Sequence, residues 1–235
     1  MSLKNFVSII IPTCNRYDTA LQSITEIKKQ KHRQYEIILC DDSDKNYYLE
    51  KFHLYEKKLN AYKVKHIYCA KFDYLGNKDY GLARSRNHGI LESKGEFLIF
   101  LDDRFTFDNE NVIELFIKEL ENNYQKIWIF GNKGCYNTLD ANANVIQINE
   151  PKKTFVENFS CIRRNHIISA GMFCERIDKY GGMTEELTIR LSKQGFKFKF
   201  VSDIKAKQIL VSDGWDKKLY QIDEMKKTLN KLYRR

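Results

Sequence analysis

The chain has 235 residues, 43% of them hydrophobic, and a formal net charge of +9 at pH 7. This length suffices for one substantial hydrophobic core, so we expect a single domain. No segment approaches the roughly 20 apolar residues that a membrane-spanning helix needs, and the N-terminus lacks the layout of a signal peptide. A soluble cytoplasmic protein is therefore expected. The positive charge suits anionic partners such as nucleotides, phosphates, acidic lipids or nucleic acid.

Missing motifs argue against two kinds of site. The six cysteines form no C-x-x-C pair and no close Cys/His cluster. We therefore expect reduced thiols, several of them in core strands, and neither a disulfide framework nor a zinc site. The chain also lacks an RRM-type signature, a zinc finger and an Arg/Gly-rich segment, so nucleic acid is not the favoured partner.

Short apolar segments alternate with helical patterns through the first half of the chain. Between Thr19 and Gln30, apolar residues recur at helical spacing on one face, and the same periodicity is clear between Asn109 and Asn123. A further helix is expected to end at Gly95 in the left-handed conformation. Pro12 is expected to stop the first strand. The predicted strands are 6–11, 35–42, 64–69, 96–103 and 126–132, and the predicted helices are 19–30, 49–59, 81–95 and 109–123.

Strands and helices in this alternation predict right-handed βαβ units and a mostly parallel sheet covered on both faces. The strands are continuously apolar, which agrees with burial on both faces. Ligands of such sheets bind beyond the carboxyl ends of the strands. Four predicted strand ends carry polar groups: Thr13 with Asn15 and Arg16, Asp41 with Asp42, the segment after Cys69, and Asp102 with Asp103.

The second half is less regular. It predicts a short strand at Val145–Ile148, helices at 163–171 and 184–195, and strands at 196–201 and 205–211. The C-terminal residues 213–235 predict a basic amphipathic helix, which either packs on its own domain or lies on an anionic membrane surface. Trp215 is either a platform for a sugar ring or a hydrophobic anchor for that helix.

The paired aspartates at two strand ends admit two interpretations. An acid at the end of a buried strand is common, because the chain there enters solvent. Two adjacent pairs, however, imply a compensating cation or hydrogen-bond donors, since like charges repel. One pair could receive ribose hydroxyls or a base N–H, and the other a metal that bridges phosphates. Arg84 and Arg86, near a predicted helix N-terminus, are either solvated surface residues or part of a diphosphate site.

Four segments together resemble glycosyltransferase family 2, the inverting GT-A group that uses nucleotide-sugar donors. They are VSIIIPTCNR, YEIILCDDSD, GLARSRNHGILESKGEFLIFLDD and GGMTEELTIRLSKQGFKF, in this order between about Phe6 and Val201. The resemblance implies a single GT-A-like α/β domain over residues 1–212. Residues 1–131 would form the nucleotide-sugar-binding half and 132–212 the acceptor half, with the helix of 213–235 outside the domain.

The resemblance also implies roles for particular residues. Pro12, Thr13 and Asp42 would hold the base and ribose, and the segment around Arg86 would flank the donor phosphates. Asp102 and Asp103 belong to the D-x-D region that holds Mg2+ or Mn2+ on the diphosphate. The full set of expected donor-binding residues is Pro12, Thr13, Asn15, Arg16, Asp42, Arg84, Arg86, Asp102 and Arg104.

Two motifs depart from the family's pattern. Arg104 stands where the last carboxylate of D-x-D belongs, so either Asp102 and Asp103 suffice for the cation, or Arg104, with Arg86, replaces it. Met183 and Thr184 stand where a Glu-Asp pair supplies the catalytic base. Glu186 is retained four residues before Arg190 and Glu185 is additional, so one of these two glutamates is the expected base, with Glu185 favoured. Alternatively, both only stabilise the helix dipole.

The expected function is therefore transfer of a sugar, with inversion, from a nucleotide-diphosphate donor, by resemblance a UDP-sugar. The acceptor would be a hydroxyl of a glycan or a lipid-linked glycan of the cell envelope, reached in the cytoplasm or at the inner face of the membrane. A second hypothesis is a catalytically impaired nucleotide-sugar-binding partner of another transferase. A third is a basic nucleic-acid-binding protein.

Overall fold

A computed structural model describes residues 5–69, 81–123, 125–134, 136–139, 145–148, 153–177 and 182–209. The elements of its first half are β1 (Val7–Thr13), α1 (Tyr17–Lys28), β2 (Tyr35–Asp41), α2 (Lys45–Ala61), β3 (Val64–Tyr68), α3 (Leu82–Glu92), β4 (Phe97–Leu101), β5 (Phe105–Phe107) and α4 (Val112–Glu121). The second half contributes β6 (Ile127–Asn132), β7 (Tyr136–Leu139), β8 (Val145–Ile148), β9 (Phe159–Arg163), α5 (Arg164–Ser169), α6 (Met183–Lys193) and β10 (Lys197–Gln208).

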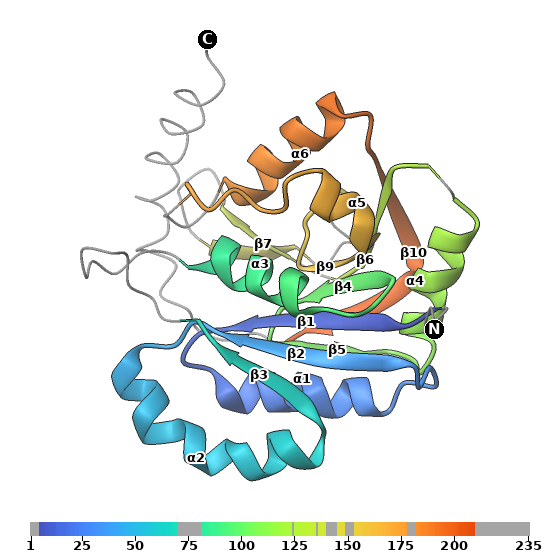
Figure 1. Ribbon diagram of the computed structural model, residues 1–235. Coiled ribbons are helices and arrows are strands. Elements are labelled where there is room, and N and C mark those ends of the chain that lie inside the picture. Colours follow the sequence, from blue (N-terminus) through green and yellow to red (C-terminus); the bar gives the residue numbers. More distant parts are fainter. Residues whose placement is uncertain are drawn as a thin grey trace.

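An eight-stranded sheet forms the middle layer, in the order β3-β2-β1-β4-β9-β6-β10-β5 (Figure 1). The neighbours β3, β2, β1 and β4 are parallel, as are β6 and β10. β9 runs antiparallel to both β4 and β6, and β5 antiparallel to β10. The prediction of a mostly parallel α/β sheet is confirmed, and the strand β9 in its centre is an element that the sequence patterns did not predict.

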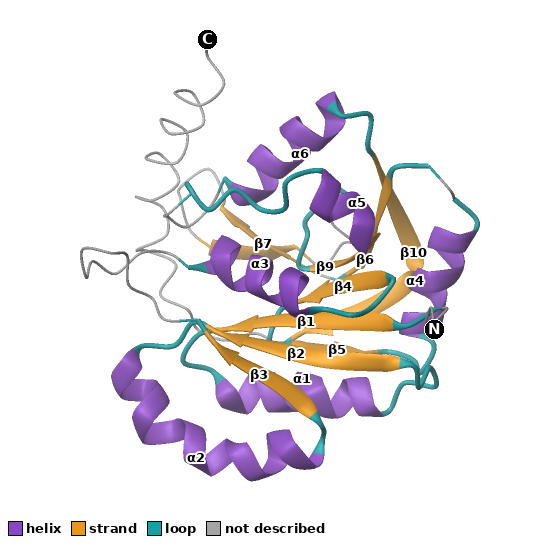
Figure 2. Ribbon diagram, viewed as in Figure 1, coloured by secondary structure: helices purple, strands orange, loops and turns teal. Residues whose placement is uncertain are grey.

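Successive residues of the central strands point to opposite faces and so build two cores. Ile9 packs under α1 and α4, whereas its neighbour Ile10 packs under α3. Helices α1, α2 and α4 cover the first face, and α3, α5 and α6 the second (Figure 2). Both faces of the central strands are therefore buried, which explains why these strands are continuously apolar.

Two predicted boundaries were wrong for local reasons. β1 continues through Pro12 to Thr13, because its pairing with β4 covers only Val7 to Ile10 and the missing proline N–H falls beyond that ladder. α3 ends at Glu92, and Gly95 does not close it in a left-handed conformation. A Cβ on Gly95 would instead clash with the backbone of Ser8.

Other differences concern the second half. The two strands predicted at 196–201 and 205–211 are one strand, β10, with a register irregularity between Val201 and Lys205. The described cysteines are free, and Cys40 and Cys161 are buried in core strands as expected. The helix predicted for 213–235, with Trp215, lies outside the described residues, and the division into donor and acceptor halves at residue 131 stays a prediction. Within the described ranges, every helix is too short or too polar to cross a bilayer.

The packing of α3 on the sheet generates a test of the fold. A Cβ on Gly89 would lie 2.5 Å from Ile10 Cγ2 and 2.9 Å from Cys40 Sγ. Alanine is favoured over glycine inside helices by about 1 kcal/mol, but overpacking a core costs about 1–3 kcal/mol. Gly89→Ala should therefore lower the free energy of unfolding, measured in urea, while His88→Ala at the exposed neighbouring position should not. Equal stability of the two variants would contradict this packing.

Candidate functional site

The carboxyl ends of β1, β2 and β4 meet at one edge of the sheet, as predicted. The Thr13 hydroxyl, at the end of β1, donates to Asp103 Oδ2 at 2.7 Å, just beyond the end of β4. The Asp42 N–H, just beyond β2, donates to the Thr13 carbonyl at 2.8 Å. The first of these contacts joins residues 90 positions apart in the sequence, so the three strand ends are linked to one another at this edge.

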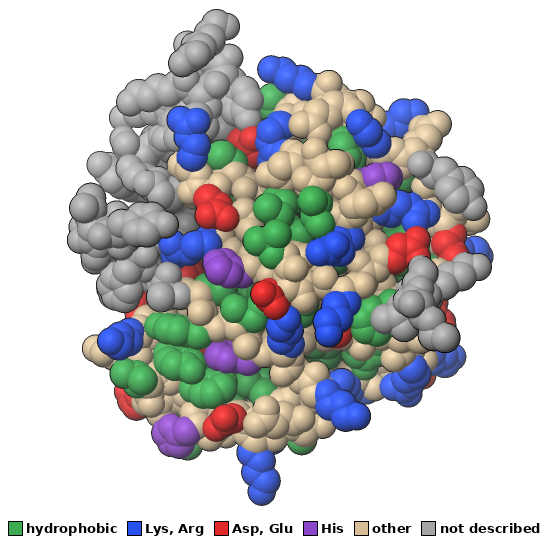
Figure 3. All heavy atoms as spheres, in the orientation of Figure 1, with side chains coloured by type: hydrophobic (Ala, Val, Ile, Leu, Met, Phe, Trp, Pro, Cys, Tyr) green, Lys and Arg blue, Asp and Glu red, His purple; other side chains and the backbone are tan. Residues whose placement is uncertain are grey.

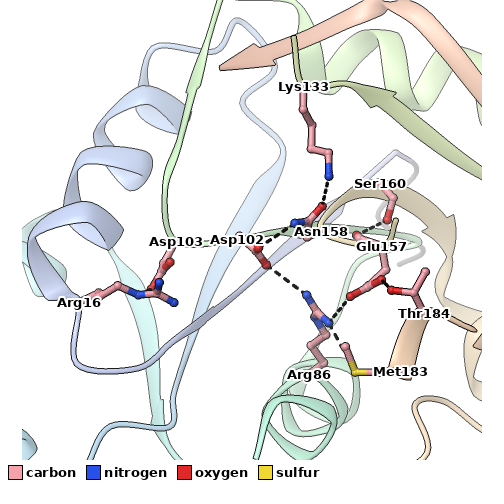
Figure 4. Close-up of polar contacts among 10 residues, drawn as sticks. All are labelled: Arg16, Arg86, Asp102, Asp103, Lys133, Glu157, Asn158, Ser160, Met183 and Thr184. Carbon is pink, nitrogen blue, oxygen red and sulfur yellow. Dashed lines mark hydrogen bonds and ion pairs between the residues drawn. The ribbon is translucent and has the colours of Figure 1, made fainter. Parts of the chain in front are cut away.

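Asp103 is a buried acid directed away from Asp102. Besides Thr13, the Arg16 Nε donates to Asp103 Oδ2 at 3.1 Å, and Figure 4 shows the carboxylate turned toward Arg16. Its other oxygen, Oδ1, has no hydrogen-bond partner within the described part of the chain. Burial raises the pKa of Asp103 to about 6, although Arg16 and the Thr13 hydroxyl favour the charged form.

Asp102 is the accessible member of the pair, with 20% of its side chain exposed. Its Oδ1 accepts from Arg86 Nη2 at 3.1 Å and its Oδ2 from Asn158 Nδ2 at 2.8 Å. The Asn158 carbonyl also accepts the Asp102 N–H, and Lys133 Nζ donates to Asn158 Oδ1 at 2.8 Å. The entry to β9 and the end of β6 therefore fix the orientation of Asp102 (Figure 4).

Arg86, on α3, is the centre of this network and only 1% of its side chain is exposed. Its guanidinium bridges two carboxylates, with Nη1 at 2.7 Å from Glu157 Oε1 and Nη2 on Asp102. The Phe173 ring lies 5.4 Å from the guanidinium carbon. Burial opposes ionisation of Glu157, but the Arg86 charge and the Thr184 hydroxyl outweigh it and hold the pKa of Glu157 below its usual value.

The two aspartates are directed toward different partners. Asp102 is directed toward Arg86 and Asn158, and Asp103 toward Arg16 and Thr13 (Figure 4). Among the described residues, His, Cys, Asp and Glu side chains form no group of three or more that would hold a metal ion. Of the two aspartates, Asp102 is the one whose partly exposed carboxylate fits a divalent cation, with phosphates and water completing the shell, which suits Mg2+. That Asp103 is also a ligand stays a prediction.

The two acids at the end of β2 also differ. Asp41 is fully buried, where it accepts from the Tyr17 hydroxyl and from the Ser43 N–H at 2.9 Å, and lies 3.2 Å from His66 Nε2. Burial opposes its ionisation, but these partners hold the pKa of Asp41 below its usual value. The Asp42 carboxylate lies against Gly81 at the start of α3, where a Cβ would clash with it. Asp41 thus has a structural role, and Asp42 lies beside the helix N-terminus.

The remaining predicted donor-binding residues surround this edge. Asn15 adopts a left-handed conformation (φ 56°), and it exchanges hydrogen bonds of 2.9 and 3.0 Å with Asp44, which fixes the loop after β1 to the loop after β2. Pro12 is buried in β1, and Arg84 on α3 and Arg104 after β4 are half-buried. Asn15 therefore shapes the edge by joining two loops.

The two predicted bases occupy different environments on α6. Glu186 is buried, and Arg190 binds both of its oxygens, at 2.7 and 3.1 Å. The same guanidinium donates to the carbonyls of Ala170 and Met172, so this pair anchors α6 to the loop after α5. Glu185 is exposed. Which residue acts as the base stays a prediction.

Met183 and Thr184 are the α6 residues that contact the Arg86 network. Met183 Sδ lies 3.6 Å from Arg86 Nη1, and the Thr184 hydroxyl donates to Glu157 Oε2. Sequence reasoning missed Glu157, along with Asn158 and Lys133. These residues lie at the start of the short antiparallel strand β9 and at the end of β6, and no periodicity marks them as site residues.

The raised pKa of Asp103 predicts a pH-dependent stability. Between about pH 4 and pH 6 the folded carboxyl binds a proton that the unfolded chain has released, so its contribution to stability falls as pH rises through this window. Asp103→Asn is neutral at every pH. Its free energy of unfolding relative to the native chain should therefore increase from pH 4 to pH 7, measured by chemical denaturation. A difference in the free energy of unfolding that stays constant with pH would show that Asp103 is not held in this environment. Asp203→Asn, at an exposed acid on β10, is the control.

Comparison with known proteins agrees with this geometry. A model described as Glycosyl transferase family 2 matches residues 8–180. An uncharacterized glycosyltransferase of Rickettsia bellii (strain RML369-C) is 32% identical over 117 residues, 50% of this chain and 15% of the relative. Escherichia coli "UDP-Glc:alpha-D-GlcNAc-diphosphoundecaprenol beta-1,3-glucosyltransferase WfaP" is 32% identical over 96 residues, 41% of this chain and 34% of the relative. The chain thus spans only a small part of the length of these curated relatives.

Solved structures share the fold. GalNAc-T7 with UDP, GalNAc and Mn2+ superposes with a TM-score of 0.63 at 19% identity, covering 89% of this chain and 45% of that one. The mannosyltransferase PcManGT of Pyrobaculum calidifontis, in complex with GDP-Man and Mn2+, gives 0.63 at 12% identity, covering 89% and 58%. The expected GT-A fold is confirmed. Since the family model covers most of the sequence, from β1 to the loop before α6, this chain belongs to glycosyl transferase family 2.

Proposed function

We propose that this chain transfers a sugar from a nucleotide-diphosphate donor, a UDP-sugar in the first instance, to a hydroxyl of a glycan or glycolipid, with inversion at the anomeric carbon. The proposal rests on the Arg86 network, which is found here in a chain that belongs to glycosyl transferase family 2. A buried guanidinium fixes the partly exposed Asp102 at the carboxyl edge of the sheet, where ligands of open α/β sheets bind.

The donor would lie across the ends of β1, β2 and β4. Asp42, with Pro12 and Thr13 beside it, is the proposed contact of the nucleoside, because it lies at the junction of β2 and the N-terminus of α3. The diphosphate would extend toward Asp102, where the α3 N-terminus, Arg84 and Arg104 supply positive potential. Arg16 and Arg86 contribute by holding the two aspartates in place.

A divalent cation is part of the proposal, with Asp102 as the residue that would hold it. The Mn2+ bound by GalNAc-T7 and by the Pyrobaculum mannosyltransferase supports this. When bound, such a cation would neutralise charge on the leaving diphosphate. The chain's own contribution is to orient Asp102 through Arg86 and Asn158.

The acceptor is proposed to be a lipid-linked glycan of the cell envelope, used at the inner face of the membrane. The name of the WfaP relative, which specifies a diphosphoundecaprenol acceptor, supports this class. The helix predicted for 213–235 would provide the peripheral contact. On the face shown in Figure 3, Lys and Arg side chains are dispersed among acidic ones, which does not favour a nucleic-acid partner there.

The second candidate, a catalytically impaired nucleotide-sugar-binding partner, has one specific observation in its favour. Glu186, the acid that is retained from the family's motif, has both of its carboxylate oxygens bound by Arg190. The two candidates differ in turnover: the transferase consumes its donor, whereas the binding partner does not.

A thermal-shift panel tests the donor site. UDP and UDP-glucose, with and without Mn2+, should raise the melting temperature, because a ligand that binds the folded state stabilises it by mass action. Asp42→Asn should weaken UDP binding about tenfold or more, since it removes a charged hydrogen-bond acceptor. Asp18→Asn, an exposed acid on α1, should bind as the native chain does. Unchanged UDP affinity in Asp42→Asn would remove Asp42 from the site, and no shift with any nucleotide would contradict the function.

A further inference from the structure

The first turn of α6 has no carboxylate at Met183 or Thr184, the two positions where the family's motif has its Glu-Asp pair. Transfer to a hydroxyl requires that the acceptor O–H lose its proton as its oxygen attacks. The α6 residues that contact the Arg86 network are Met183 and Thr184, neither of which is a base at neutral pH. Arg190 binds both carboxylate oxygens of Glu186, and Glu185 is exposed.

A carboxylate from the segment before β9 lies against the first turn of α6. Glu157, two residues before β9, accepts the Thr184 hydroxyl on Oε2 and the Arg86 guanidinium on Oε1. Its backbone carbonyl accepts from the Ser160 hydroxyl, which in turn accepts from the Trp128 indole N–H at 2.8 Å. Glu157 is therefore held on a rigid strand entry, and its partner across the hydrogen bond is the residue at the position where the family motif has its aspartate.

Glu157 is also coupled to the donor side of the edge. Its neighbour Asn158 binds Asp102 directly, and Arg86 joins Glu157 to Asp102 through one guanidinium. The Glu157–Asn158 dipeptide thus places a carboxylate against the Thr184 hydroxyl and an amide against Asp102, the residue proposed to lie at the donor diphosphate. Thr184 is half-buried whereas Glu157 is buried, so Thr184 is the more accessible partner of this hydrogen bond.

We propose that Glu157 is the general base of the transfer and that the Thr184 hydroxyl relays the proton to it; the inference rests on the function proposed above. The acceptor O–H gives its proton to Thr184 Oγ1 while Thr184 passes its own proton to Glu157 Oε2. The acceptor oxygen bonds to the anomeric carbon as the carbon–oxygen bond to the diphosphate breaks, and that electron pair leaves with the diphosphate. Glu157 returns the proton to solvent after the products depart.

A purely positioning role for Glu157 predicts a different set of effects. If Glu157 only held Arg86 and through it Asp102, its loss would weaken donor binding and the Thr184 hydroxyl would not matter. As a base, it acts on the acceptor, so donor affinity should be preserved and the hydroxyl should be required. Thr184→Val separates the two roles, because valine keeps the shape and leaves the Glu157–Arg86 pair intact.

The experiment measures UDP release from UDP-glucose with water as acceptor, together with UDP affinity by calorimetry. If UDP-glucose does not raise the melting temperature, the donor used is whichever of UDP-N-acetylglucosamine, UDP-galactose and GDP-mannose raises it most. Affinity is then measured for the matching nucleoside diphosphate. Glu157→Gln and Thr184→Val should each lower the turnover rate roughly 10²-fold, with nucleotide affinity changed no more than a few-fold. Thr184→Ser should retain most of the rate. Thr188→Val, one turn along α6, is the matched control and should resemble the native chain.

A rescue variant completes the test. Thr184→Asp places a carboxylate at the motif position, so adding it to Glu157→Gln should recover at least tenfold of the lost rate. Turnover within a few-fold of native in Thr184→Val would overturn the relay, and parallel losses of rate and nucleotide affinity in Glu157→Gln would reduce Glu157 to a positioning residue. If the native chain neither binds nor hydrolyses any donor of the panel, the proposed function itself fails, and the inference with it.

Discussion

The buried guanidinium of Arg86 is the interaction on which the functional edge depends. Removing a charged group from water costs several kcal/mol unless partners compensate it. Here one guanidinium is compensated by Asp102 and Glu157, which lie 16 and 71 residues further along the chain. The pairing can form only when α3, the end of β4 and the entry to β9 are all in place. The ionic network therefore couples the completed fold to the orientation of Asp102.

Much of the architecture followed from sequence, because parallel strands buried on both faces are continuously apolar and the helices between them are amphipathic. The convergence of Thr13, Asp42 and Asp103 could be predicted because the carboxyl ends of parallel strands meet at one edge. β9 could not, because a five-residue antiparallel strand has the same local pattern as a buried loop. Because β9 was not predicted, Glu157 and Asn158, which precede it and bind Arg86 and Asp102, were also missed.

The direction of the acidic side chains was the second feature that could not be predicted from the sequence. Asp102 and Asp103 are adjacent and chemically identical, yet Asp102 is partly exposed beside Arg86 and Asp103 is buried against Arg16. The same contrast separates Glu185, which is exposed, from Glu186, which is buried against Arg190, whereas Asp41 and Asp42 are both buried but against different partners. In each pair the sequence located the acids correctly but not their partners, which come from distant segments. A pair of carboxylates in sequence is thus not yet a pair of metal ligands in space.

The central claim is that this edge of the sheet binds a nucleotide-sugar donor with its diphosphate at Asp102. A crystal structure of the chain with UDP and Mn2+ tests it most directly. The account predicts the uridine against Asp42 and the diphosphate at Asp102, in direct contact or through a bound cation, with Asp103 still directed toward Arg16. A nucleotide that contacts neither Asp42 nor Asp102 would contradict it.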